Sequence, residues 1–586
     1  MTINSMPPKP CYKPAHTKQY LTMALSTAIL VAGCSTNEHA IEEQEHAPHL
    51  STAKEQARSQ GKKAKHESKI AAQAVLMDAT MPEMRIASGA YISPALPPSP
   101  PISTERYQNI EQNSVMAVSE SPVSTFSIDV DTASYANIRR FINNGQIPPA
   151  NAVRTEELIN YFDYQYMPPS SESQPFSVHY EVGPSPWNSD RTLLHIGIQG
   201  YKEQAATRPA ANLVFLVDVS GSMNSTDKLP LVKKSLRLLT KQLNQDDRIS
   251  LVVYAGSARV VLEPTPGDKT YKILQAIDQL QAGGSTHGSA GIELAYQLGQ
   301  QATIEKGINR VVLATDGDFN VGVSSIDELK NYIEQKRKTG IQLSVLGYGT
   351  GNYNDALMEE LSNRGNGNAA YIDNLKEAQK VLVDEMSSTL QTIASDVKLQ
   401  MEFNPQWVQE YRLLGYENRL LNREDFNNDK VDAGEIGAGH SLTAIYELTL
   451  VDAKKPWNDP LRYGEKQAPH SAKNNSSELG LLKIRYKLPD QSNSKLLQFP
   501  VNKNAIKSSL SSTSEAFRFA SSVAGFSELL RNSQYLDSYS FDDVVKQAER
   551  AKGRDQYGYR SEFVQLARLA QTLADEPQNK GGVDGG

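Results

Sequence analysis

Residues 213–222 read Leu-Val-Phe-Leu-Val-Asp-Val-Ser-Gly-Ser. The apolar run that ends at Val217 is typical of a strand buried on both faces of a parallel sheet. Asp218, Ser220 and Ser222 follow where such a strand would leave the core. Side-chain oxygens at alternate positions of a tight turn can all point at one hard cation. The stretch therefore predicts an α/β fold with a candidate metal site at the end of this strand.

The stretch opens a region, residues 209–392, in which apolar strands alternate with amphipathic helices. Leucine and valine side chains between Leu229 and Leu243 recur every three or four residues, which is the period of a helix. This alternation predicts a doubly wound, Rossmann-like, mostly parallel six-stranded sheet with helices on both faces. The strands are expected at 212–217, 249–254, 259–262, 310–315, 342–346 and 369–372.

Two further segments place oxygen atoms at the same edge of the predicted sheet. Ligands of open parallel sheets bind beyond the carboxyl ends of the strands. Asp316 follows the strand expected at 310–315, and Gly283-Gly284-Ser285-Thr286 is a flexible loop that carries hydroxyls. The combined set consists of carboxylates and hydroxyls, which suit Mg²⁺ or Mn²⁺.

These three elements together resemble the metal-ion-dependent adhesion site (MIDAS) of von Willebrand factor type A (VWA) domains. The resemblance implies that Ser220, Ser222 and Thr286 bind the metal directly, and that Asp218 and Asp316 bind it mostly through water. Neutral hydroxyl ligands leave most of the charge of the metal uncompensated, which attracts an outside carboxylate. The family resemblance implies that this carboxylate is an Asp or Glu of a partner protein.

The first 33 residues look like a lipoprotein signal peptide. A basic stretch precedes the apolar run Leu21–Gly33, which is too short to span a bilayer. Val31-Ala32-Gly33-Cys34 resembles a bacterial lipobox, which implies cleavage before Cys34 and lipidation of that residue; an ordinary secreted cysteine or a short buried helix is the alternative. We expect a cell-envelope protein whose lipid is its only membrane attachment. By the same resemblance, Ser35 after Cys34 is not the Asp that favours retention in the inner membrane of Gram-negative bacteria, so the outer membrane, facing the periplasm or the cell surface, is favoured if the organism is Gram-negative.

Residues 34–120 are expected to form a disordered tether between the lipid and the folded part. They begin with charged residues and end in the Pro-rich stretch Leu96-Pro97-Pro98-Ser99-Pro100-Pro101. Such a composition buries too little apolar surface to fold, and the prolines favour an extended chain. Residues 577–586 are expected to be a second disordered tail.

The α/β region is flanked on both sides by β-rich, α+β segments, residues 121–208 and 393–576. Apolar and polar residues alternate at 176–182 in the first segment and at 482–488 in the second, which is a strand signal. Either the α/β domain is inserted into one host domain, or two independent domains flank it. The sequence leaves both arrangements open.

Stretches outside the metal motifs sharpen the family resemblance. They are similar to the matching parts of YfbK-type bacterial lipoproteins, which carry a VWA domain. The likeness covers nearly everything from residue 120 onward, and it implies membership of a family whose molecular role is poorly defined. The stretches are 124–135, 156–163, 347–354 and 437–444.

Composition and missing motifs argue against several functions. The chain of 586 residues has a net charge of −7 and lacks a basic stripe with interleaved aromatic residues, so no nucleic-acid binding is predicted. Neither a dinucleotide Gly-x-Gly-x-x-Gly after the first strand nor a phosphate-binding Gly-x-x-x-x-Gly-Lys-Ser/Thr occurs, so no nucleotide is expected. There is no Gly-x-Ser-x-Gly elbow and no candidate cysteine nucleophile. We therefore predict a binding protein and not an enzyme.

Two alternative functions stay open at this point. The first is a metal-dependent phosphoester hydrolase, in which a metal-bound water attacks the substrate and His287, beside Thr286, serves as general base. The second is a structural scaffold of the envelope whose metal site is silent.

Several other residues are secondary candidates. Asn352 and Tyr353 either line the metal site or only start a helix. Asp425, Asn427 and Asp429 resemble the start of a calcium loop, but the glycine that such a loop needs is missing, so an acidic turn is favoured. Asp129 and Asp131 are expected to be solvated.

Overall fold

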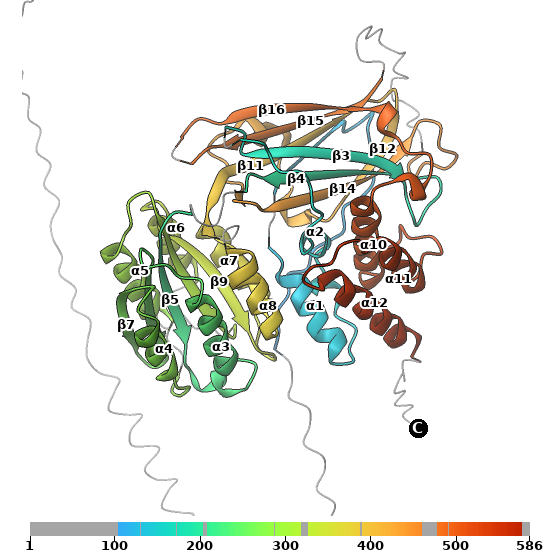
Figure 1. Cartoon of the computed structure of the whole chain (residues 1–586). Coiled ribbons are helices and arrows are strands. Elements are labelled where there is room, and N and C mark those ends of the chain that lie inside the picture. The colour runs from blue at the N-terminus through green and yellow to red at the C-terminus, as the bar shows by residue number, and fades with distance from the viewer. Residues whose placement is uncertain are drawn as a thin grey trace, which may run out of the picture. The chain divides into compact units, whose positions relative to one another are not determined.

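The structure is a computed structural model (Figure 1). It describes residues 104–128, 131–171, 173–202, 208–285, 288–317, 326–386, 390–459, 477–489 and 491–576. All of them belong to one compact unit that starts at Pro98. The predicted signal peptide, Cys34 and the tail 577–586 lie outside the described residues. In the described part, no helix is both long and apolar enough to cross a membrane.

The α/β region contains the predicted six-stranded sheet. Its order is β10-β9-β8-β5-β6-β7, and every neighbouring pair is parallel except β6 and β7. Each strand expected from the sequence is present, so the predicted fold class is confirmed. The strands are β5 (Ala211–Asp218), β6 (Arg248–Tyr254), β7 (Ala258–Pro266), β8 (Ile308–Thr315), β9 (Gln342–Tyr348) and β10 (Ala369–Ile372).

The central strand β5 is buried on both faces, as its continuous apolar run predicts. Leu213, Phe215 and Val217 belong to one core, whereas Val214 and Leu216 belong to the other. Successive side chains of a strand point to opposite faces, so each core needs its own layer of helices. The first core includes α3 (Leu229–Thr240), α4 (Thr270–Asp278) and α8 (Leu375–Gln379); the second includes α5 (Ser289–Gln301), α6 (Ile326–Arg337) and α7 (Asp355–Arg364).

The two flanking segments share their sheets, so the α/β domain is inserted into one host. One sheet has the order β1-β12-β14-β4-β3, and the other has the order β13-β11-β15-β16 with β2 also paired to β11. The N-terminal strands are β1 (Met116–Ala117), β2 (Val123–Ser127), β3 (Phe176–Pro184) and β4 (Thr192–Gly200). The C-terminal strands are β11 (Thr392–Phe403), β12 (Val408–Leu414), β13 (Gly434–Gly437), β14 (Ser441–Leu450), β15 (Glu478–Lys487) and β16 (Lys495–Asn502).

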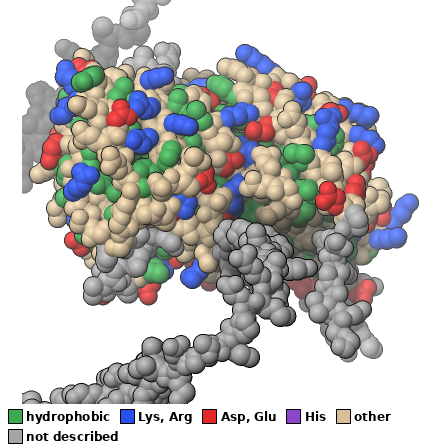
Figure 2. Space-filling model, turned by 90° about the horizontal axis from the view of Figure 1, so that it is seen from below, with side chains coloured by type: hydrophobic (Ala, Val, Ile, Leu, Met, Phe, Trp, Pro, Cys, Tyr) green, Lys and Arg blue, Asp and Glu red, His purple; other side chains and the backbone are tan. Residues whose placement is uncertain are grey.

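The host has two hydrophobic cores. One contains side chains from both sheets, including Phe126, Ile196 and Leu482, and makes the sheets a sandwich. The other joins Leu193 and Ile445 of the sandwich to a layer of helices (Figure 1). These helices are α1 (Ala133–Asn143), α2 (Thr155–Asn160), α10 (Glu515–Leu530), α11 (Phe541–Arg550) and α12 (Tyr559–Asp575). On the molecular face shown in Figure 2, basic and acidic side chains are interspersed.

His195 in β4 should make the host sensitive to acid. Its ring is buried, with Nε2 2.9 Å from the Tyr166 hydroxyl, and burial lowers its pKa to about 3. In the unfolded chain the imidazole of His195 is protonated near pH 6.5, whereas in the folded protein it stays neutral down to about pH 3. The contribution of the neutral ring to folding stability is therefore complete above pH 6.5 and is lost as the pH falls from 6.5 to 3. Between pH 7 and 4.5, we expect wild type to lose about 2 to 3 kcal/mol more unfolding free energy than His195→Gln. Urea denaturation at both pH values measures this.

The control for this comparison is His179→Gln, because His179 is only partly buried in the neighbouring strand β3. The His179→Gln variant should lose as much unfolding free energy between pH 7 and 4.5 as wild type does. If wild type and His195→Gln lose the same unfolding free energy between pH 7 and 4.5, His195 is not the cause of the acid sensitivity.

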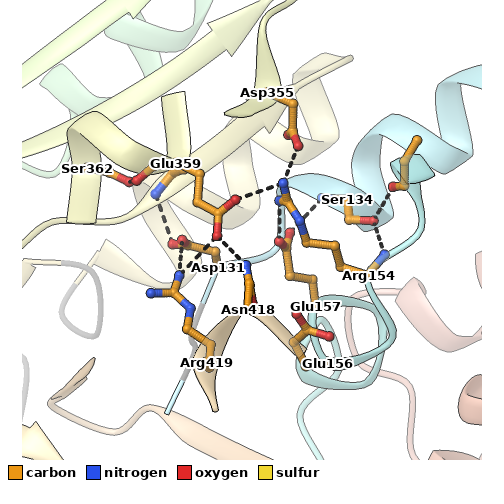
Figure 3. Close-up of polar contacts among 12 residues, drawn as sticks. Asp131, Ser134, Arg154, Glu156, Glu157, Asp355, Glu359, Ser362, Asn418 and Arg419 are labelled. Carbon is orange, nitrogen blue, oxygen red and sulfur yellow. Dashed lines mark hydrogen bonds and ion pairs between the residues drawn. The ribbon is translucent and has the colours of Figure 1, made fainter. Parts of the chain in front are cut away.

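Buried ion pairs join the inserted domain to its host. Arg154, which precedes α2 of the host, contacts Glu157 at 2.7 Å, Glu359 of α7 at 2.8 Å and also Asp355 at the start of α7 (Figure 3). Only 4% of the Arg154 side chain is exposed. Four charged groups therefore depend on one another where α7 meets the host.

Asp131 belongs to the same junction, and the prediction that it is solvated is wrong. It is 4% exposed, accepts a hydrogen bond of 2.9 Å from the Ala369 backbone N–H at the start of β10, and lies 3.6 Å from Arg419 (Figure 3). The sequence pattern suggested an outward strand position, but β2 ends at Ser127 and the chain then turns toward the inserted domain. Asp129 lies outside the described residues.

Residues 104–120, which were predicted to belong to the disordered tether, are bonded to the folded domain. Thr104 N donates 2.8 Å to Gly351 O, and Arg106 N donates 3.0 Å to Tyr353 O. Met116 and Ala117 form β1, which pairs with β12. Polar composition suggested disorder here, but this stretch is stabilised by backbone hydrogen bonds to the folded domain, which do not depend on side-chain hydrophobicity.

The favoured acidic turn is present only at Asp429 and Lys430, because Asp425 and Asn427 lie in the short 3₁₀ helix Arg423–Asn427 that precedes it. Asp425 caps a short 3₁₀ helix: its carboxylate accepts a hydrogen bond of 3.1 Å from the Asn422 backbone N–H. An Asp used in this way is a local capping residue and needs no calcium ion.

Candidate functional site

Two neighbouring strands bring the predicted carboxylates together. Asp218 is the last residue of β5, and Asp316 follows directly after β8. The strands are parallel and adjacent, with Val217 opposite Ala314, so both carboxylates lie at the same edge. Both residues are 0% exposed. This edge is where an open α/β sheet is expected to bind its ligands.

The loop after β5 adds two hydroxyls. The Ser220 backbone N–H donates 2.8 Å to Oδ1 of Asp218, which fixes the first turn. The Oγ atoms of Ser220 and Ser222 are 3.0 Å apart. Gly221 N also donates 3.0 Å to Gly284 O, so the Gly-rich loop that leads toward Thr286 packs on the serine loop. Thr286 and His287 themselves lie outside the described residues.

Asp218 is in an unfavourable environment for a bare carboxylate. Burial, the largest cause, and the charge of Asp316 raise its pKa to about 6, although hydrogen bonds from Ser220 and Tyr254 act in the opposite direction. Its Oδ2 atom is buried and makes no hydrogen bond of normal geometry within the described chain. A buried oxygen of this kind is costly unless another group compensates its charge.

Asp316 has different partners. Oδ2 accepts 2.8 Å from Nζ of Lys228, and the same ammonium donates 3.1 Å to Oδ1 of Asn352. Burial acts to raise the pKa of Asp316, but hydrogen bonds from Lys228, Ser222 and Asn352 outweigh it and lower the pKa. One of the two carboxylates is thus paired with a cation, and the other is not.

Lys228 is the functional-site residue that the sequence argument missed. It is 7% exposed and occupies the N-cap position of α3. A lysine is disfavoured there, because the N-terminal end of a helix carries a partial positive charge. A basic residue directly before the apolar stripe of a helix, in a loop rich in oxygen atoms, was the available signal.

Of the secondary pair, Asn352 reaches the site and Tyr353 does not. The Asn352 carboxamide bonds Lys228 and Asp316. Tyr353 is 1% exposed, and its hydroxyl donates 3.2 Å to Asp355 in the core behind the loop. The stretch therefore lines the site and also starts helix α7.

The residues present fit a hard divalent cation. Asp218 is a buried carboxylate without a cationic partner among the described side chains, and the hydroxyls of Ser220 and Ser222 and the carboxylate of Asp316 lie at the same edge of the sheet. Within the described residues, no group of three or more His, Cys, Asp or Glu side chains could hold a metal. Any metal at this edge would therefore rely on hydroxyl ligands, and these oxygen donors suit Mg²⁺ or Mn²⁺.

Family models match most of the described chain. Residues 212–384 match the model of the von Willebrand factor type A domain, and residues 101–195 match a model described as von Willebrand factor. Residues 388–573 match the model "Uncharacterized protein YfbK, C-terminal". The boundary of the inserted domain in the structure agrees with the division among these models.

The chain is also similar to individual proteins. The chain is 47% identical over 483 residues to "Uncharacterized protein YfbK" of Escherichia coli, covering 81% of this chain and 82% of that protein. It is 22% identical over 302 residues to human inter-alpha-trypsin inhibitor heavy chain H3, covering 48% and 33%. A solved von Willebrand factor type A protein from Catenulispora acidiphila shows 14% identity and a TM-score of 0.39, with coverage of 70% and 91%.

Proposed function

The chain belongs to the family of the Escherichia coli protein YfbK and contains a VWA domain, and from this premise we propose that it binds a partner protein through a divalent metal ion. Mg²⁺ or Mn²⁺ would be held by Asp218, Ser220, Ser222, Thr286 and Asp316. The partner would supply a carboxylate as a further ligand. VWA domains are protein-interaction modules in many homologous proteins.

One observation carries this proposal: the edge combines two buried carboxylates, of which only Asp316 is paired with a cation, with the hydroxyls of Ser220 and Ser222. Oδ2 of Asp218 is buried without a hydrogen bond of normal geometry, and the pKa of Asp218 is raised to about 6. A divalent cation would compensate this charge, whereas neutral hydroxyl ligands would not cancel the charge of the cation. The remaining positive charge favours an anionic group of a partner.

The proposal includes the location of the protein. Cleavage before Cys34 and lipidation of this residue would anchor the chain in the cell envelope, and in the outer membrane if the organism has one. The polar segment that follows would hold the VWA domain away from the lipid surface. A test is metabolic labelling with a palmitate analogue, in which Cys34→Ala should lose the label; equal labelling of both proteins would contradict the anchor.

Metal binding is tested first with Ser222→Ala. Ser222 is exposed, so the substitution should leave the fold intact. We expect wild type to bind Mg²⁺ in calorimetry and to melt at a higher temperature with Mg²⁺ than with EDTA. Ser222→Ala should bind at least about ten-fold more weakly, because one hydroxyl ligand is lost.

The control is Ser225→Ala, which removes an exposed hydroxyl of the same loop. The Ser225 hydroxyl is bonded to Asp227 and not to the candidate site. It should bind Mg²⁺ like wild type. A wild-type protein that shows no Mg²⁺ binding at millimolar concentrations would refute the proposed site.

Partner binding is tested by capture from an envelope extract. Wild-type protein should retain a partner in Mg²⁺ and release it in EDTA, and Ser222→Ala should retain less of it. A partner that all three samples retain equally would exclude the metal bridge. His287, the general base of the hydrolase alternative, lies outside the described residues.

A further inference from the structure

Lys228 is built into the candidate site and is not a mobile surface lysine. Its ammonium is bonded to Asp316 Oδ2 at 2.8 Å and to Asn352 Oδ1 at 3.1 Å, and its side chain is 9% exposed. The pairing joins residues 88 positions apart in the sequence. Burying an ammonium costs free energy unless its partners are held in place, so the surroundings of Lys228 must be ordered.

The stem of Lys228 packs on a glycine that leaves room for it. Gly349 has φ +77°, and a Cβ at this position would lie 2.4 Å from Cε of Lys228. A side chain at residue 349 would therefore push the stem away from Asp316. The glycine explains how the ammonium can approach the carboxylate so closely.

The loop that holds Lys228 is itself fixed from the other side. The Gly351 backbone N–H donates 2.9 Å to Oε1 of Glu105, and Thr104 N donates 2.8 Å to Gly351 O. Glu105 in turn forms two hydrogen bonds of 2.8 Å with the guanidinium of Arg140 in helix α1. The ammonium is thus placed by a continuous set of contacts that reaches into the host.

The fixed ammonium changes the charge of the edge. Asp218 and Asp316 with Lys228 sum to one negative charge. A divalent cation would bring this edge to one positive charge, whereas without Lys228 the two carboxylates would neutralise the cation. At such short distances an unpaired charge strongly affects the binding of further ions.

We infer that Lys228 determines which ligands the metal-loaded edge accepts: it weakens metal binding and in return makes the loaded site select an anionic ligand over a neutral one. The inference rests on the proposed metal site and deepens it. Lys228 contacts Asp316 and would not coordinate the metal itself. It acts as a specificity-determining residue through its charge.

Lys228→Met tests this inference, because methionine keeps the unbranched stem beside Gly349. Two affinities are measured by calorimetry: that for Mg²⁺, and that of the Mg²⁺-loaded protein for acetate, with acetamide as the neutral counterpart. We expect Mg²⁺ affinity to rise about ten-fold and acetate affinity to fall about ten-fold, since a unit charge is removed close to both ions. Acetamide binding should not change.

Two further proteins complete the experiment. Lys228→Gln keeps a donor for Asp316 without the charge and should show the same opposite changes, so a folding defect of the Met variant cannot decide the outcome. Lys234→Met removes an exposed ammonium on the same helix and should behave like wild type.

The outcomes separate this inference from the proposal beneath it. Opposite shifts of the two affinities support the role of Lys228. If both affinities of Lys228→Gln are unchanged, or if both fall, the role of Lys228 is overturned. Binding of Mg²⁺ by wild type would still support the metal site in that case. Absence of Mg²⁺ binding in wild type would overturn both.

Discussion

Arg154→Met is expected to lower the free energy of unfolding by about 3 to 5 kcal/mol. The guanidinium is the common partner of Glu157, Asp355 and Glu359, and all four side chains are less than one-tenth exposed. Methionine fills part of the volume but leaves three buried carboxylates without their shared cation. Leaving charges buried and uncompensated costs far more than losing an exposed ion pair. Equilibrium urea denaturation measures the change.

Arg364→Met is the matched control for Arg154→Met. Arg364 ends helix α7, is 49% exposed and lies 3.3 Å from Glu334. Its replacement should change stability by less than about 0.5 kcal/mol. If the two variants lose equal stability, the junction is not held by Arg154.

The same junction explains why the inserted domain and the host should unfold together. Asp355 begins α7, directly after the loop that contains Asn352, so Arg154 of the host holds the helix next to the candidate site. Arg154→Met should therefore also lower the cooperativity of unfolding, which appears as two transitions in place of one.

Asp218→Asn is expected to stabilise the metal-free protein by about 3 kcal/mol at pH 7.5, because it removes a buried charge that the fold tolerates poorly. The pKa of Asp218 is raised from 3.8 to about 6. A raised pKa means that the folded state prefers the protonated carboxyl, so the destabilisation is complete above pH 6 and disappears toward pH 4. The Asn variant should also lose its response to Mg²⁺.

Denaturation of both proteins in EDTA at pH 7.5 and pH 4 measures this prediction. The difference between Asp218→Asn and wild type should be largest at pH 7.5 and should vanish near pH 4. Asp227→Asn, a change at a partly buried residue of the same loop, should give no such difference. A variant that is less stable than wild type at pH 7.5 would show that Asp218 is adequately compensated without a metal.

A stabilising substitution at a site of function is a recognisable pattern, since binding sites keep groups that the fold alone would not select. A stabilising Asp218→Asn substitution would indicate that Asp218, whose pKa is raised, is kept for binding a ligand. Asp316 does not show it, because Lys228 supplies its counter-charge.

The elements of the inserted domain were predictable from the sequence. Burial on both faces requires an unbroken apolar run, as in residues 213–217, and local periodicity distinguishes it from the helix that begins at Leu229. The positions of Asp218 and Asp316 followed, because the carboxyl ends of parallel strands meet at one edge. The order of the host strands could not be predicted from local sequence, because the paired strands β2 and β11 are separated in the chain by the whole inserted domain.

Local sequence thus decided which oxygen atoms gather at the end of the central strand, because strand ends and the turns after them depend on neighbouring residues. Only the tertiary structure decided their charges and partners. Lys228 forms an ion pair with Asp316, and the backbone N–H of Ala369 donates a hydrogen bond to Asp131. Arg154 of the host forms an ion pair with Asp355 of α7. Each contact joins distant segments, and electrostatic energy depends on separation and burial in space and not on distance along the chain.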